Sequence, residues 1–176
     1  MSDLYDQIAS QRGSLERLVS RIPGFTGYQE RGDRRTADRM LRDHIADQLG
    51  QQVGRMSRIE KTILDKMGLS YMSETRDAKT KLQTYHDRVK AAAPGYSGLF
   101  SAMKIGAEEL TRIYSFDEAQ VRYVDKISEA LDTLDQAADN KEGIDAAIDG
   151  VYQAAVKANE AFALREDVLT NLNKSL

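Results

Sequence analysis

The sequence predicts an all-α protein: an antiparallel up-and-down bundle of about five helices, three of them long. Apolar residues recur at spacings of three and four along most of the chain, which is the period of an amphipathic helix. No stretch shows the sustained alternation of apolar and polar residues that is typical of a strand. The predicted connections are short, so consecutive helices are expected to run antiparallel.

A chain of 176 residues is expected to form a single helical domain, residues 1–176, that is large enough to bury a core. It has no cysteine, which excludes disulfides and thiolate metal sites. The N-terminus lacks a signal-peptide pattern, and no apolar run approaches the roughly 20 residues that span a bilayer. We therefore expect a cytoplasmic protein.

Charge is distributed unevenly along the chain. Residues 1–106 carry 18 Lys and Arg against 13 Asp and Glu, whereas residues 107–176 carry 7 against 15. Either the two parts attract each other when packed, or the basic part meets an acidic partner. Asp residues dilute the basic part, and the chain is acidic overall, so we expect no nucleic-acid partner.

The first helix is predicted over residues 3–21, with an apolar face formed by Leu4, Ile8, Leu15, Leu18 and Ile22. Gly13 weakens this helix by about 1 kcal/mol relative to alanine. Pro23 ends it, because proline has no N–H and moves the preceding residue out of the helical region. Phe25 and Tyr28 follow on a short loop, and we expect them to fold over the end of the bundle.

The second helix is predicted from about residue 30 to residue 66, with an apolar seam that includes Leu41, Ile45 and Leu49. Beside the seam runs a stripe of small residues: Ala46, Gly50, Gly54 and Ser57. The two glycines cost an isolated helix about 2 kcal/mol relative to alanines. Either a neighbouring backbone packs closely there, within the bundle or across a dimer, or the helix kinks near Gly50. We favour close packing.

Three further helices are predicted at about 70–92, 106–138 and 143–173 from their apolar periodicity. Between the first two of them, Pro94-Gly-Tyr-Ser-Gly98 is similar to Pro23-Gly-Phe-Thr-Gly27, the turn that precedes the second helix. In an up-and-down bundle both turns lie at the same end, so we expect them to be side by side.

No catalytic motif is found. The two histidines do not complete the Glu-x-x-His pairs of ferritin-like metal sites, and no glycine-rich phosphate loop occurs. A metal-dependent helical enzyme is an alternative suggested by an acidic row on the last two helices: Asp132, Asp135, Asp139, Asp145 and Asp149. The row lacks a second matching cluster, so we predict no catalytic residue, no metal and no cofactor.

The densest basic group lies around the start of the second helix and comprises Arg31, Arg34, Arg35, Arg39 and Arg42. Asp33, Asp38 and Asp43 interleave with these arginines, so we expect local pairing on a solvated face. Peripheral binding of the basic N-terminal half to an anionic membrane surface is the second alternative.

The run Ile22-Pro-Gly-Phe-Thr-Gly-Tyr28 and its continuation to Arg42 resemble a recurring segment of a family of uncharacterised bacterial all-helical proteins. The runs Gly98-Leu-Phe-Ser-Ala-Met-Lys-Ile105 and Tyr114-Ser-Phe-Asp117 are similar to a later segment of the same group. The resemblance implies a bacterial helical domain of the cytosol, and it implies no activity.

We therefore expect a non-enzymatic helical interaction or scaffold protein that binds another protein or itself. Its predicted contact surface combines the aromatic residues of the two turns with two arginines: Phe25, Tyr28, Arg34, Arg35, Tyr96 and Phe100. A homo-oligomer would form along the small-residue stripe.

Overall fold

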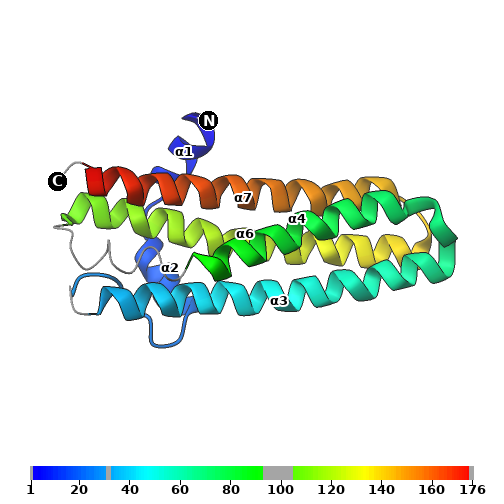
Figure 1. The fold of residues 1–176 in the computed structure, drawn as a ribbon, viewed down its shortest axis with the longest axis horizontal. Helices are drawn as coiled ribbons and strands as arrows, with labels where there is room; N and C mark the ends of the chain where they lie inside the picture. Colours follow the sequence, from blue (N-terminus) through cyan, green and yellow to red (C-terminus); the bar gives the residue numbers. More distant parts are fainter. Residues whose placement is uncertain (1, 31–32, 93–104, 175–176) are drawn as a thin grey trace.

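The computed structural model describes residues 2–30, 33–92 and 105–174. These residues are helical apart from turns and loops, and none of them lies in a β-strand, which confirms the predicted all-α class. In chain order the helices are α1 Ser2–Ala9, α2 Ser14–Arg21, α3 Arg34–Met67, the 3-10 turn η1 Gly68–Tyr71, α4 Met72–Ala91, α6 Ala107–Asn140 and α7 Ile144–Lys174 (Figure 1). None of these described helices has the length and apolar character needed to cross a bilayer.

Four of the helices form an elongated bundle built from two hairpins (Figure 1). One hairpin joins α3 to α4 through η1, and the other joins α6 to α7 through residues 141–143. The hairpins pack together with α3 against α6 and α4 against α7. Consecutive helices therefore alternate in direction, as predicted.

The contacts between the hairpins are parallel, which the sequence did not indicate. Arg55 of α3 pairs with Asp132 of α6, and farther along both helices Lys66 pairs with Asp139. Likewise Arg88 of α4 pairs with Glu166 of α7, whereas the earlier residue Lys81 contacts the ring of Tyr152. A helix thus has an antiparallel neighbour in its own hairpin and a parallel neighbour in the other.

The single helix predicted over residues 3–21 is wrong, because the chain forms two short helices there. Gly13 precedes α2 with φ 69°, a left-handed conformation that an α-helix does not contain. The break lets α1 pack on α6 and α7 while α2 packs along α6. The segment between α1 and α2 is hydrogen-bonded to α6, since Ser115 Oγ donates a hydrogen bond to the carbonyl of Gln11 at 3.2 Å.

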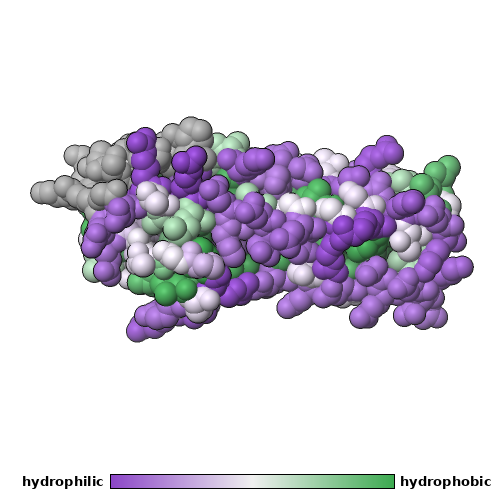
Figure 2. All heavy atoms as spheres, turned by 90° about the horizontal axis from the view of Figure 1, so that it is seen from below, coloured by the Kyte–Doolittle hydropathy of each residue, from purple (hydrophilic) through white to green (hydrophobic). Residues whose placement is uncertain are grey.

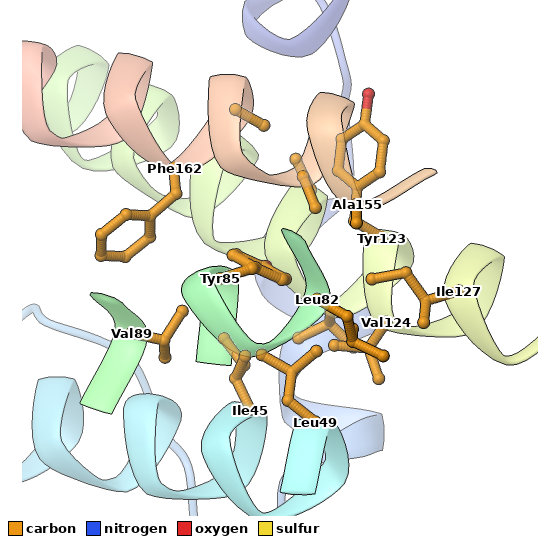
Figure 3. Packing of buried hydrophobic residues seen from close by; sticks show 14 of the residues in the cluster. Ile45, Leu49, Leu82, Tyr85, Val89, Tyr123, Val124, Ile127, Ala155 and Phe162 are labelled. Atoms are coloured by element: carbon orange, nitrogen blue, oxygen red, sulfur yellow. The ribbon is translucent and has the colours of Figure 1, made fainter. Parts of the chain in front are cut away.

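The core runs along the axis of the bundle, and each long helix contributes apolar side chains to it (Figure 3). At mid-length the labelled residues are Ile45, Leu49, Leu82, Tyr85, Val89, Tyr123, Val124, Ile127, Ala155 and Phe162. The rings of Tyr85 and Phe162 meet edge to face with centroids 6.4 Å apart. Buried alanines on α7, including Ala155, Ala158 and Ala161, leave room for the neighbouring helices.

The small-residue stripe of α3 is not a site of close packing within the described bundle, so the part of the prediction that placed close packing inside the bundle is wrong. Helix α3 continues through Gly50, but only Ala46 of the stripe is buried, and Gly50 and Ser57 are exposed. A Cβ on Gly50 would lie 3.8 Å from Nε2 of His86, and one on Gly54 would lie 3.7 Å from Nη1 of Arg58. These are ordinary contacts with side chains. The dimer across this stripe stays a prediction.

Candidate functional site

The predicted contact surface is wrong for the three of its members that are buried. Phe25 is 2% exposed, Tyr28 is 0% exposed and Arg34 is 4% exposed, because the loop after α2 folds into the bundle instead of lying over its end. Arg35 is exposed. Tyr96 and Phe100 lie outside the described residues, as does the second turn, so their side-by-side arrangement with the first turn is not described either.

Tyr28 is held in the bundle through its ring, its hydroxyl and its backbone. Its ring stacks on that of Tyr114 with centroids 5.4 Å apart and planes 8° apart, and its N–H donates to the Tyr114 hydroxyl at 2.7 Å. Its own hydroxyl donates to Oδ2 of Asp117 at 2.6 Å, and its carbonyl accepts from Nε of Arg34 at 2.6 Å. The loop is therefore attached to α3 and α6 by directional contacts.

A buried chain of charges extends from Asp117 across three helices. Arg165 of α7 donates from Nε to Oδ1 of Asp117 at 2.5 Å and from Nη2 to Oδ1 of Asp38 at 2.8 Å. The other oxygen of Asp38 accepts from Nη2 and Nε of Arg42 at 2.5 and 2.9 Å. Together with Tyr28 these four residues form what we call the ionic cluster, in which no residue is more than 4% exposed.

Burial controls the protonation of the ionic cluster. It raises the pKa of the Asp117 carboxyl above its usual value, although the charge of Arg165 and the hydroxyl of Tyr28 act in the opposite direction. Burial alone would lower the pKa of Arg165, but the charges of Asp117 and Asp38 raise it well above its usual value. Burial also raises the pKa of Tyr28 well above its usual value, so Tyr28 acts as a hydrogen-bond donor.

The ionic cluster is a structural feature and not an accessible reaction centre, because no ligand reaches such buried groups without a rearrangement. It joins α3, α6 and α7 at one level and connects the loop after α2 to them. Ion pairs of this kind contribute little net stability but strongly disfavour arrangements that leave one partner unpaired. The cluster therefore disfavours any register of these helices that would separate its charges.

The sequence held a signal for this cluster. Asp117 interrupts an apolar series between Tyr114 and Val121, and Arg165 lies three residues after Phe162 and four before Leu169, on the core side of its helix. By contrast, Asp38 and Arg42 lie next to the apolar seam of α3, where the sequence predicts a solvated face. That prediction is wrong for these two residues, which are buried.

Part of the acidic row forms ion pairs between the two hairpins. Asp132 pairs with Nη2 of Arg55 at 2.5 Å, and Asp139 pairs with Nζ of Lys66 at 2.7 Å. Two of the five carboxylates are thus directed at α3. Within the described parts of the chain, no three carboxylate or imidazole groups converge in a way that would suit a metal ion.

Two other carboxylates of the acidic row, those of Asp145 and Asp149, line a pocket at the other end of the bundle from the ionic cluster. This acidic pocket has a volume of about 230 Å³ and lies between the first turns of α4 and α7, where it is lined by Glu74, Asp77, Asp145, Ile148, Asp149 and Tyr152. Asp149 accepts a weak hydrogen bond from Nε2 of Gln153 at 3.3 Å. None of the four carboxylates takes part in an ion pair with another described residue.

Apolar groups accompany this negative charge. Ile148 is buried and forms part of the pocket wall with the ring of Tyr152. The ring already makes a cation–π contact within the protein, since Nζ of Lys81 lies 5.9 Å from its centroid. The pocket therefore offers carboxylates for a positive charge and an apolar surface for the carbon chain that carries it.

The same end of the bundle exposes a large apolar side chain. The two hairpin turns, residues 68–71 and 141–143, lie together at what we call the hairpin end (Figure 1). Leu69 in the first of these turns is 78% exposed. On the face shown in Figure 2, hydrophilic residues predominate and apolar ones appear only in small groups. The hairpin end thus carries both an exposed leucine and the acidic pocket.

No protein-family model matches the chain, and neither a curated protein nor a solved structure is a match to it. The resemblance to bacterial helical proteins stays an expectation.

Proposed function

We propose that this protein is a non-enzymatic helical module that binds a basic segment of another protein at its hairpin end. The observation that supports this proposal is the acidic pocket. It places Glu74 and Asp77 of α4 opposite Asp145 and Asp149 of α7, with no basic partner in an ion pair among the described residues. Such a concentration of negative charge attracts a cationic partner.

The shape and lining of the pocket favour a lysine or arginine side chain over a free metal ion. A metal ion needs several carboxylates converging on one point, and the described residues provide no such group. A lysine or arginine side chain has a carbon stem that packs on apolar surface and a charged head that meets carboxylates. Ile148 and Tyr152 supply the first kind of contact, and the four acidic residues supply the second.

Leu69 supports a partner that is a protein segment. Exposed leucines are common on protein surfaces, but this one lies at the same end as the acidic pocket and has little contact with its own chain. A segment that carries both basic and apolar side chains would contact the two features together.

The two alternatives receive less support. Peripheral membrane binding relies on the basic group of α3, but Arg34 and Arg42 are buried, and the exposed residues of this segment include Asp33 and Asp43 as well as Arg35. A metal-dependent enzyme relies on the acidic row, in which Asp132 and Asp139 pair with residues of α3.

The proposal is tested by fluorescence anisotropy with a labelled peptide of alternating lysine and leucine, and with a glutamate–leucine peptide of the same length. The lysine peptide is expected to bind at low salt and the glutamate peptide is not. The double variant Asp145→Asn, Asp149→Asn should weaken binding by roughly tenfold, because it removes two charges from the pocket. Raising the salt above about 0.15 M should weaken wild-type binding as well.

The matched control is Asp3→Asn, Asp6→Asn, which makes the same change in net charge on exposed positions of α1. It should leave peptide binding unchanged. Equal loss in both double variants would show that only net charge matters and would overturn the proposed site. Absence of binding by the wild-type protein at low salt would overturn the proposed function.

A further inference from the structure

We draw no further inference here: the strongest candidate, the pocket of about 470 Å³ between the first turns of α6, the last turns of α7 and Tyr5 of α1, has an apolar wall with a charged rim, and nothing in the structure shows what covers it.

Discussion

Arg165 and Asp117 join α7 to α6 inside the bundle, with Nε of the guanidinium 2.5 Å from Oδ1 of the carboxylate. The same guanidinium reaches Asp38 on α3 through Nη2 at 2.8 Å. One side chain thus connects α6 and α7, which form one hairpin, to α3, which belongs to the other. It therefore links the two hairpins inside the bundle.

Arg165→Met is expected to lower the free energy of unfolding by about 3–5 kcal/mol, because Asp117 loses its buried counter-charge while the side-chain volume is nearly kept. Urea unfolding followed by circular dichroism measures the change. Arg76→Met is the control, since Arg76 is exposed on α4 and a surface change of this kind should stay within about 0.5 kcal/mol. Similar small effects from both substitutions would show that the ionic cluster does not hold the hairpins in register.

The raised pKa of Asp117 predicts a pH dependence. The folded protein holds a proton on this carboxyl more tightly than the unfolded chain does, because burial disfavours the charged form. Its contribution to stability is therefore complete below the unfolded pKa, about 4, and is lost as the pH rises through the folded pKa. Asp117→Asn removes this titration.

The quantity to measure is the unfolding free energy of the wild type minus that of Asp117→Asn, from urea curves between about pH 4 and pH 7. This difference should fall as the pH rises. Using the difference cancels the groups that titrate in both proteins. A difference that grows with pH would mean that Arg165 and the Tyr28 hydroxyl outweigh burial in the native protein.

Gly27 is expected to tolerate no side chain. Its φ is 96°, and a Cβ there would lie 2.6 Å from the hydroxyl of Tyr114, which is already fixed by the N–H of Tyr28. Gly27→Ala should lower the free energy of unfolding by more than about 2 kcal/mol, since backbone strain and a steric clash act together.

The matched variant is Gly13→Ala. Gly13 also has a positive φ, 69°, in the left-handed helical region, and a Cβ there would make only ordinary contacts with the side chains of Arg17 and Glu16, so only the strain of about 1 kcal/mol is expected. Urea unfolding of both variants separates the two causes. If Gly27→Ala costs no more than Gly13→Ala, the loop does not pack on Tyr114 as described.

The glycines at positions 50 and 54 of α3 provide the test for self-association. Each added Cβ would make only ordinary contacts with side chains, so Gly50→Ala and Gly54→Ala should each raise the free energy of unfolding of the monomer by about 1 kcal/mol. Sedimentation velocity of the wild type and the double variant then reports the mass in solution.

A dimer across the small-residue stripe predicts that the wild type sediments as a dimer and that the double variant dissociates. A wild type that is monomeric at every concentration would rule out the dimer, and the glycines would then be a tolerated cost of the helix.

Local sequence determined where the long helices lie. The periodic pattern predicted helices at about 70–92 and 143–173, and the structure has α4 at Met72–Ala91 and α7 at Ile144–Lys174. Apolar spacing succeeds here because a helix that buries one face must place apolar residues three and four apart. Apolar spacing did not predict the break at Gly13, where a single left-handed residue interrupts an otherwise continuous helical pattern.

Apolar spacing predicts less of the candidate site than of the fold. The acidic row is visible in the sequence. Which of its carboxylates pair with α3 and which line the acidic pocket depends on the helix that lies opposite each residue. No sequence pattern connects Glu74 and Asp77 with this row. They join Asp145 and Asp149 because α4 and α7 lie side by side in parallel.

By itself, then, the sequence determined the helical class, the long helices and most of the residues that face the core. Only the tertiary structure decided that Tyr28 is buried, that Arg165 joins Asp38 to Asp117, and that the hairpins pack in parallel. The reason is physical. Periodicity along a chain reports which face of a helix is buried, whereas the partner of a buried charge is set by another helix that the local pattern does not contain.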